Sequence, residues 1–451
     1  MQEQKTGRAM MPCNNFHIVK LHYAPICKAR PAWCNMPVME NKGTHGWASA
    51  THGAIAGIRV IDLSRVLAGP YCTQMLADHG ASVLKIEPPQ GDETRALGPP
   101  FVGDTAAYFL GLNRNKAAIA LDLTLPSARE VLLTLLEGAD VLVENFLPGT
   151  MEKWGLGYEA TLAPRFPRLI HCRISGFGAD GPLGGLPGYD AVLQAMGGVM
   201  SVNGDATDGG TRVGIPIVDI TTGMNAAFGI MLALAERARS GMGQLVDICL
   251  YDTALSLLIP HAANWFASGQ VPRPMGSAHP NIAPYDKFAT ADGEMFLGVV
   301  SDAQFRKFCV AIDRPQWIDD ARYCTGVARI ADREALTRDI EGVLRELSAE
   351  DLCVRLMAAG VPAGPLNDLA RALEHPHTRH RGMVVELGGV KGLGVPIKLS
   401  RTPGAALRPP PAFGGDTRAS LAAAGYTDGK IEQLLSEKAV HIRPAARTPR
   451  A

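Results

Sequence analysis

The sequence predicts an α/β fold built on a parallel sheet, and two observations carry this prediction. Short, continuous apolar segments typical of buried strands alternate with amphipathic segments of helical period, starting at Gly57. Segments of this kind form parallel βαβ units, because parallel neighbours need a long crossover connection between them. Ligands bind such sheets at the carboxyl ends of the strands, so the segments after each strand are the first place to look for function.

The individual elements follow from apolar runs and their boundary residues. Pro70 opens a helix that Gly80 ends, and Pro126 opens one that Gly138 ends, since proline suits the first helical turn and glycine the position after the last. A longer apolar helix follows in the middle of the chain. The expected strands are residues 59–63, 82–87, 119–123, 140–144 and 169–174, and the expected helices are residues 70–79, 126–137 and 222–239.

Changes in composition divide the chain into segments. Residues 1–56 lack a clear period and are expected to be a disordered or mis-started leader. Pro and Gly are dense around a predicted linker, and a smaller α/β or α+β unit follows it. The predicted segments are a large domain at 57–265, a linker at 266–284, a small domain at 285–382, a return to the large domain at 383–437 and a basic tail at 438–451.

Composition excludes several classes of protein. The chain of 451 residues carries 44 Lys plus Arg and 44 Asp plus Glu, without the basic excess of a nucleic-acid binder. Its nine cysteines form no C-x-x-C pair, which fits a reducing compartment and a cytoplasmic location; the basic leader leaves the mitochondrial matrix as the alternative. No apolar run is long enough to predict a membrane span. The spacing of His375, His377 and His380 matches no common metal site.

One glycine motif imitates a dinucleotide site. Residues 176–181 read G-x-G-x-x-G after a predicted strand. A dinucleotide site needs a helix to start on this turn, because the helix N-terminus holds the pyrophosphate. Pro182, Gly184 and Gly185 follow at once and prevent such a helix, so no nicotinamide cofactor is expected.

Two aspartates stand out as possible reactive groups. Asp219 follows the apolar residues 213–218, which are read as a short strand, and precedes a helix. An aspartate at this position commonly caps the helix, but an ionised carboxylate on such a turn also serves as a covalent nucleophile toward an acyl group. Asp190 has the same two readings at the start of another predicted helix, and its local sequence does not choose between them.

From about Gly57 to about Leu435 the chain resembles the class III CoA-transferases, the formyl-CoA transferase or CaiB-like family. The resemblance starts with VIDLSRVLAGPYCTQ (60–74) and includes VENFLPG (143–149) and DITTGM (219–224). The number of motifs and their order carry it, although each is weak alone. The other matching segments are residues 77–88, 91–95, 113–116, 175–178, 188–190, 197–201, 241–247 and 360–365.

The resemblance implies a fold, an assembly and a mechanism. The fold would be a Rossmann-like large domain with a smaller inserted domain, and two chains would interlock as a homodimer. Asp219 would attack an acyl-CoA and carry the acyl group and then CoA in a ping-pong reaction. Asp190 would be a second catalytic residue, and backbone N–H groups around Gly276 would stabilise the oxyanion. No metal and no permanently bound cofactor are implied, since CoA thioesters are the substrates.

The resemblance also implies contacts to coenzyme A. Lys153 stands where the family often has arginine, while Leu67 and Pro88 depart from the formyl-CoA enzyme and argue against formyl-CoA and oxalate as substrates. Residues 57–437 carry 34 basic and 42 acidic side chains, so the phosphates must be held locally, which directs attention to lysines such as Lys116. The implied contact residues are Arg65, Val66, Leu67, Ala68, Lys116, Leu121, Asn145, Phe146 and Lys153.

Two alternatives to transfer remain at this point. An α-methylacyl-CoA racemase needs two acid–base groups, and related racemases place a histidine where this chain has Tyr189. Tyrosine has an ordinary pKa near about 10 and is a poor base at neutral pH, which favours transfer. A CoA-binding protein without catalysis is the second alternative. The expected reaction moves CoA from an acyl-CoA, for example succinyl-CoA, to a small free carboxylic acid, without nucleic acid or membrane as partner.

Overall fold

The structure is a computed structural model that describes residues 52–207 and 209–442. The leader predicted at 1–56 lies almost entirely outside these residues, as does most of the basic tail. The described chain is a mixed α/β structure with one large sheet, which confirms the predicted class.

The large sheet has seven strands in the order β14-β5-β2-β1-β6-β7-β8. Six of them are parallel, and only β14 pairs antiparallel, with β5 at one edge. The chain builds β1, β2 and β5 outward in one direction and then returns to place β6 on the other side of β1. The sheet strands are β1 (Arg59–Asp62), β2 (Ser82–Glu87), β5 (Lys116–Leu121), β6 (Val141–Glu144), β7 (Ile170–Ser175), β8 (Leu245–Cys249) and β14 (Val440–His441).

Alternate residues of each strand face two separate cores, as the pleat requires. Ile61, Leu84 and Ile119 pack in one core together with helices α3 (Pro126–Leu136) and α18 (Asp428–Ser436). Val60 and Val83 pack in the other core with α1 (Ala68–Asp78) and α8 (Ile217–Ser240). Both faces of the sheet are therefore covered by helices, and the strands read as continuous apolar runs because neither face meets water.

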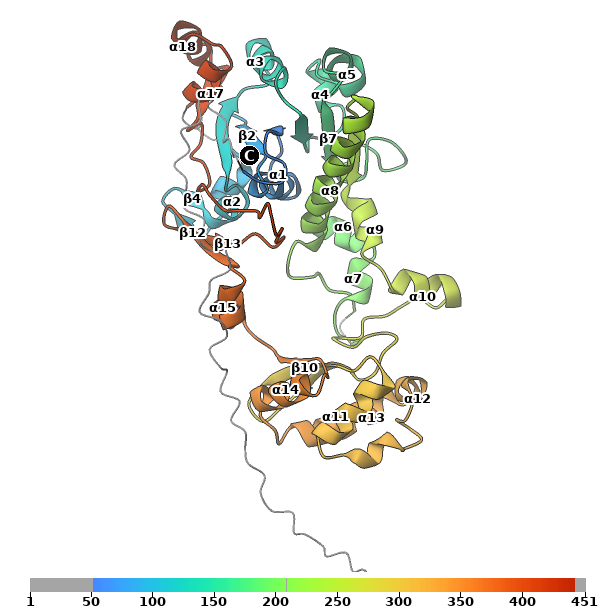
Figure 1. Cartoon of the computed structure of the whole chain (residues 1–451). Coiled ribbons are helices and arrows are strands. Elements are labelled where there is room, and N and C mark those ends of the chain that lie inside the picture. Colours follow the sequence, from blue (N-terminus) through green and yellow to red (C-terminus); the bar gives the residue numbers. More distant parts are fainter. Residues whose placement is uncertain (1–51, 208, 443–451) are drawn as a thin grey trace, which may run out of the picture. The chain divides into compact units, whose positions relative to one another are not determined.

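Helices connect the strands and cover the sheet (Figure 1). The helices before residue 283 are α1 (Ala68–Asp78), α2 (Ala107–Leu112), α3 (Pro126–Leu136), α4 (Thr150–Lys153), α5 (Ala163–Arg165), α6 (Asp190–Met196), α7 (Val199–Val202), α8 (Ile217–Ser240), α9 (Leu250–Ser256) and α10 (His261–Ser268). Two short irregular turns, η2 (Glu93–Ala96) and η3 (Tyr158–Leu162), and a small hairpin, β3 (Phe101–Val102) with β4 (Thr105–Ala106), complete this part.

A third core forms between Ala283 and Val361 around a small antiparallel sheet, in the order β11-β10-β9. Its elements are β9 (Tyr285–Ala289), β10 (Glu294–Gly298), α11 (Asp302–Ala311), η4 (Pro315–Ile318), α12 (Gly326–Ala331), α13 (Arg333–Leu344), α14 (Ala349–Ala358) and β11 (Ala363–Pro365). Because this core has its own sheet and its own buried side chains, it packs independently of the two cores beside the large sheet.

The C-terminal segment returns to the large sheet. Asp416 accepts a hydrogen bond from the backbone N–H of Ala118 in β5, and β14 pairs with the same strand. Two short helices and a hairpin precede Asp416, and two further helices lie between Asp416 and β14. The elements are α15 (Leu369–Glu374), α16 (Pro376–His380), β12 (Val384–Leu387), β13 (Val390–Leu393), α17 (Thr417–Ala423) and α18 (Asp428–Ser436).

Two sequence predictions of local structure are wrong. Residues 213–218 do not form a strand; the chain is irregular up to Pro216, and α8 starts at Ile217, so Asp219 lies inside the first helical turn. Pro216 has no N–H to give to a sheet ladder, and strand pairing is not available to this segment. Residues 245–249, which were not predicted as a strand, form β8 at the edge of the sheet.

Charged side chains are fully buried below the carboxyl end of β1. Asp62, Lys85 and Lys116 are each 0% exposed, and the Lys116 ammonium lies 3.1 Å from the Asp62 carboxylate. Ser64 and Thr73 donate further hydrogen bonds to Asp62. Burial alone would raise the pKa of Asp62, but the two lysines and these hydrogen bonds lower that pKa to about 2. The carboxylate is therefore ionised and pairs with Lys116, while the Lys85 ammonium lies 2.9 Å from the buried Asp92 carboxylate.

Helix α8 is long and apolar enough to cross a membrane by length and composition, with 39% of its most apolar window buried. Its Val218, Ala226 and Ile230 pack in the core beside α1. Helices in the core of globular proteins pass the same test.

Replacing Asp62 should destabilise the fold. Asp62→Ala leaves the buried Lys116 ammonium without its ion-pair partner, whereas Lys85 keeps its ion pair with Asp92. Loss of one partner costs about 3–5 kcal/mol in comparable buried pairs. Urea unfolding followed by circular dichroism measures this. Asp104→Ala, on an exposed turn, is the control and should leave the midpoint nearly unchanged. A midpoint for Asp62→Ala equal to that of the control would contradict the compensating role.

Candidate active site

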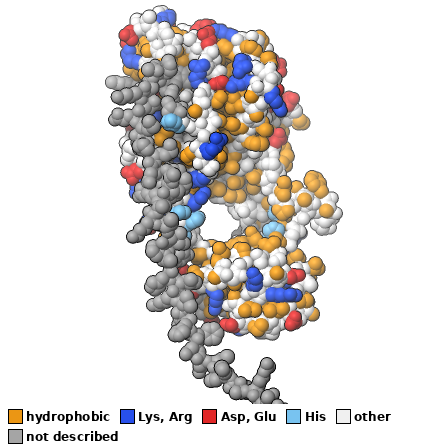
Figure 2. Space-filling model, in the orientation of Figure 1, with side chains coloured by type: hydrophobic (Ala, Val, Ile, Leu, Met, Phe, Trp, Pro, Cys, Tyr) orange, Lys and Arg blue, Asp and Glu red, His pale blue; other side chains and the backbone are white. Residues whose placement is uncertain are grey.

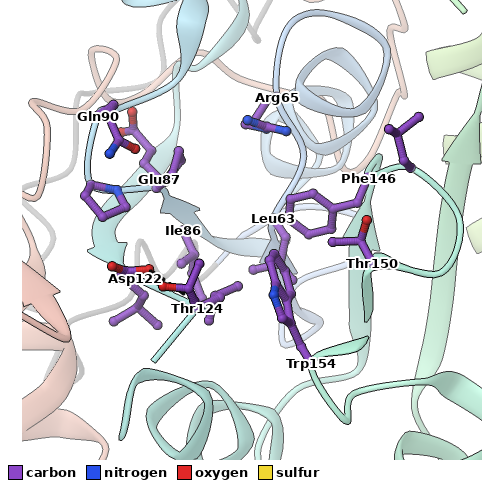
Figure 3. Close-up of a pocket in the computed structure, with 15 residues that line it drawn as sticks. Leu63, Arg65, Ile86, Glu87, Gln90, Asp122, Thr124, Phe146, Thr150 and Trp154 are labelled. Atoms are coloured by element: carbon purple, nitrogen blue, oxygen red, sulfur yellow. Dashed lines mark hydrogen bonds between the residues drawn. The ribbon is translucent and has the colours of Figure 1, made fainter. Parts of the chain in front are cut away.

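Two cavities open at the carboxyl edge of the sheet, beside the neighbouring strands β1 and β6, where the order in which the chain adds strands reverses direction. Open parallel sheets bind ligands at such a switch point, because the loops after the two strands leave in opposite directions. The first cavity has a volume of about 420 Å³. Figure 3 shows Arg65, Phe146 and Trp154 along one side and Gln90, Glu87 and Asp122 along the other. Its remaining lining is largely apolar: Leu63, Ile86, Pro88, Pro89, Leu121, Leu123, Thr124, Leu147 and Thr150.

The second cavity, of about 270 Å³, reaches Asp219. It shares Arg65, Phe146 and Leu147 with the first cavity. The two cavities therefore adjoin, and these three residues form their common wall. The other lining residues are Val66, Leu67, Ala68, Glu93, Asn145, Pro148, Ile174, Ser175, Gly176, Leu186, Pro187, Gly188, Tyr189 and Leu250.

Asp219 projects from the first turn of α8 and lines the second cavity. Within residues 52–207 and 209–442, no group donates a hydrogen bond to its carboxylate. Burial raises the pKa of Asp219 to about 7, and the negative charge of Asp190 adds to this rise. Near neutral pH the group is thus only partly ionised, and its ionised form has few stabilising contacts, which favours nucleophilic attack.

Asp190 caps α8 in place of Asp219. Its Oδ1 atom accepts hydrogen bonds from the backbone N–H groups of Val218 (2.8 Å) and Asp219 (3.2 Å). Its Oδ2 atom accepts one from the Gln194 amide at 2.7 Å. Because both oxygens are occupied and the residue is 7% exposed, Asp190 holds the start of α8 and does not face the cavity. The structure thus separates two roles that the sequence left open for both aspartates.

Two tyrosines lie near these aspartates. Tyr108 was not identified from the sequence, and Tyr189 was considered only as a possible base of a racemase. Burial raises the pKa of Tyr108, on α2, to about 12, and the charges of Asp219 and Asp190 contribute. Its hydroxyl therefore stays protonated beside the acidic pair. Tyr189 lines the second cavity and is 67% exposed. Only the fold brings Tyr108 near Asp219, so no local sequence signal marks it.

Most of the expected coenzyme A contacts line the cavities. Arg65 and Phe146 line both, and Leu121 lines the first. Lys153 is exposed at the end of α4, between the lining residues Thr150 and Trp154, without lining the cavity itself. The residues that line only the second cavity are Val66, Leu67, Ala68 and Asn145.

Lys116 does not occupy the place expected for a phosphate contact. Its side chain is fully buried, and its ammonium group donates to the Asn113 side chain and the Pro70 carbonyl in addition to Asp62. Arg114, in the same motif, is buried in an ion pair with Asp78. This motif stabilises the fold and leaves no exposed ammonium or guanidinium group for a ligand.

Gly276 also departs from its expected role. Its backbone N–H donates to the Gly204 carbonyl at 2.9 Å, and the N–H of Ala278 donates to Met275. Gly276 does not line the cavity that contains Asp219. In this conformation these two N–H groups are therefore not available to an oxyanion. Within the described ranges, no group of three His, Cys, Asp or Glu side chains is placed to hold a metal ion.

The loop between β1 and α1 is held from several sides. The Asn145 side chain accepts a hydrogen bond from the Arg65 N–H at 2.9 Å and donates one to the Arg65 carbonyl at 2.7 Å. Lys85 donates to the Ser64 carbonyl at 2.8 Å. Between them Val66 adopts a φ of 70°, a left-handed conformation that a β-branched residue takes only when its surroundings impose it.

Neutralising Asp219 should stabilise the protein at high pH. The carboxyl group has a pKa of about 7 in the folded chain against an ordinary value of 3.8. The folded state thus holds the proton more tightly, and the ionised group destabilises it above pH 7 but not below about pH 4. Asp219→Asn should gain on the order of 4 kcal/mol at pH 8, and this gain should vanish below pH 4. Urea unfolding across this range measures it; an equal gain at both ends would contradict the raised pKa.

Comparison with known proteins gives one consistent result. A family model described as CoA-transferase family III matches residues 55–417. A succinate–glutarate CoA-transferase from Agrobacterium fabrum is 40% identical over 80% of this chain and 93% of its own length. An acetyl-CoA:oxalate CoA-transferase from Acetobacter aceti is 40% identical over 77% of this chain and 90% of its own length.

A solved structure agrees with the sequence relatives. A CAIB/BAIF family protein from Brucella suis superposes with a TM-score of 0.75 at 39% identity, covering 83% of this chain and all of its own. The match includes both strands that border the switch point and the helix that carries Asp219, since residues 55–417 span them all. The chain belongs to CoA-transferase family III, the CaiB/BaiF family.

Proposed function

We propose that this chain moves CoA from an acyl-CoA to a free carboxylic acid through covalent intermediates on Asp219. The observation that carries this proposal is a carboxylate that accepts no hydrogen bond from any described residue and lies in the smaller of two adjoining cavities. A carboxylate that must form and break acyl bonds gains from weak ground-state stabilisation, because interactions made only in the transition state raise the rate.

Each step conserves atoms and charge. An Asp219 oxygen attacks the thioester carbonyl, the C–S bond breaks, and an aspartyl–acyl anhydride and a CoA thiolate form. The thiolate then attacks the aspartyl carbonyl of the anhydride, which gives an aspartyl-CoA thioester and releases the donor acid. The acceptor carboxylate reverses the sequence and leaves as the new acyl-CoA, with Asp219 regenerated. No proton is consumed, so the enzyme needs an ionised aspartate and no general base.

The adjoining cavities suit the extended shape of coenzyme A. The nucleotide end fits the first cavity, where Phe146 and Trp154 supply aromatic surface with ring centroids 5.2 Å apart. The pantetheine arm would pass the shared wall and bring the thioester to Asp219. Among the residues that line the two cavities, Arg65 is the one with a basic side chain, so it is the candidate contact to a phosphate.

The names of relatives suggest a substrate class. Relatives at 35–40% identity are named as CoA-transferases that act on glutarate, mesaconate, D-citramalate or oxalate, most with succinyl-CoA. We infer that this chain takes a small dicarboxylic acid as acceptor and that succinyl-CoA is a donor. Racemisation is the second candidate function. The exposed Tyr189 lines the cavity at the position where related racemases have a histidine, and tyrosine is a poor base at neutral pH, which favours transfer. Deuterium exchange at the α-carbon of a 2-methylacyl-CoA would reveal racemisation.

Assembly, domain limits and location remain part of the proposal. We infer an interlocked homodimer, with residues 285–382 as a small domain inserted between the two parts of the large domain, 57–265 and 383–437. Helix α8 exposes apolar side chains, including Phe228 (65% exposed) and Leu232 (56% exposed), and α10 exposes Phe266. Figure 2 shows hydrophobic side chains gathered on this face of the molecule. Exposed apolar surface of this kind supports a protein interface. A cytoplasmic location is expected, with the mitochondrial matrix as the alternative.

Asp219→Ala should reduce transfer from succinyl-CoA to glutarate by at least about 10⁴-fold, because the covalent nucleophile is gone. In the unaltered protein, incubation with succinyl-CoA followed by hydroxylamine should convert Asp219 to a hydroxamate, which mass spectrometry of the peptide detects. Transfer by the Asp219→Ala variant at more than a few per cent, or a modified residue elsewhere, would refute the assigned nucleophile.

A charge on the exposed face of α8 should prevent assembly. Phe228→Glu should convert a dimer to monomers in sedimentation velocity, since an unpaired charge at a buried interface is strongly unfavourable. Val327→Glu, on α12 at a side chain that is 80% exposed, is the matched control and should leave the dimer intact. A Phe228→Glu protein that remains a dimer would contradict an interface on this face.

A further inference from the structure

Asn145 connects the two loops that leave the sheet at the switch point. The pairing of β1 with β6 ends where Asp62 lies beside Val143, with one further backbone hydrogen bond from Leu63 to Val143. Beyond this point the Asn145 side chain connects the two segments, because it forms hydrogen bonds with both the N–H and the carbonyl of Arg65. A side-chain amide thus imitates one more backbone pair after the strands have separated.

This pair of hydrogen bonds stands next to the strained residue of the loop. Val66 follows Arg65 and has its φ at 70°, while α1 starts two residues later at Ala68. Its own N–H has only a long contact, 3.4 Å, to Asp92. The conformation therefore depends on what fixes its neighbours: Asn145 on Arg65, and Lys85 on Ser64. A free valine would relax to an extended conformation, since its Cβ branches disfavour a positive φ.

The same loop forms the wall that both cavities share. Arg65 lines both cavities, and Val66 to Ala68 line the one that contains Asp219. On the opposite side Phe146 also lines both cavities, and the buried Glu144 accepts its backbone N–H at 2.8 Å. Rotation of Val66 out of its left-handed conformation would move the Arg65 side chain away from the junction of the two cavities.

We propose that Asn145 is a positioning residue: it clamps the backbone of Arg65, keeps Val66 left-handed and so holds the shared wall in its ligand-binding shape. This inference rests on the proposed function, because it takes coenzyme A as the ligand of the adjoining cavities. It differs from the role implied by family resemblance, in which Asn145 contacts coenzyme A. Both polar atoms of its side chain are already engaged by Arg65.

A double-variant cycle separates the two roles. Asn145→Ala removes the clamp, and Val66→Gly removes the strain that the clamp must oppose, because glycine adopts a positive φ freely. Binding of free CoA, measured by calorimetry and by the fluorescence of Trp154 in the first cavity, reports on the wall without requiring turnover. Asn145→Ala should weaken CoA binding about tenfold, as expected when two hydrogen bonds that order a site are lost.

We expect Val66→Gly to rescue CoA binding in the Asn145→Ala variant. Asn145→Ala with Val66→Gly should recover at least half of the lost affinity on a logarithmic scale, relative to Val66→Gly alone. Asp313→Gly is the matched control, because Asp313 is also left-handed, with a φ of 57°, but follows α11 in the third core. It should give no rescue.

Two results would overturn the inference: losses that simply add, as a direct contact to CoA predicts, or an Asn145→Ala variant that binds CoA normally. If Asn145→Ala does not fold, Asn145→Asp keeps the acceptor for the Arg65 N–H, removes the donor to its carbonyl and enters the same cycle. Failure of the unaltered protein to bind CoA would instead overturn the proposed function, and this inference with it.

Discussion

The candidate site depends on one constraint, the capping of α8 by Asp190. A helix start offers unpaired N–H groups that would normally bind and stabilise a carboxylate on the first turn. Here Asp190 accepts the N–H groups of Val218 and Asp219. The Asp219 carboxylate therefore lacks the stabilisation that its own position would provide, and the nearby charge of Asp190 raises its pKa further. A structural carboxylate thus keeps a reactive one poorly stabilised.

The buried charged side chains at the carboxyl end of β1 hold the loop that lines the same site. Asp62, Lys85 and Lys116 fix the carboxyl end of β1 and the start of the loop that follows, and Asn145 fixes the next residue from the neighbouring strand. Such buried ionic groups are expensive to desolvate and stabilise a fold only when fully paired. Here they define the conformation of a loop at the switch point, where the sheet leaves room for a ligand. Rigidity at this loop and reactivity at α8 are complementary properties of one site.

Much of the fold was predictable because its signals are local. Continuous apolar runs marked the central strands, and Pro126 with Gly138 marked the helix between two of them. Asp219 was identified through family resemblance, whereas the strand predicted before it does not exist. The burial of Lys116 was not predicted, because its counter-charge, Asp62, lies 54 residues away in sequence. The cap at Asp190 and the clamp at Asn145 are likewise contacts between distant segments, which no local pattern encodes.

The charge of Asp190 adds to the effect of burial on the pKa of Asp219, and one measurement tests this contribution most directly. The rate of acyl-enzyme formation from succinyl-CoA, followed in single turnovers against pH, should fall as pH drops through about 7, because the nucleophile becomes protonated. In Asp190→Asn, which retains an oxygen acceptor for the start of α8 but no charge, this fall should move to lower pH. An acid limb at the same pH in both proteins would contradict the account.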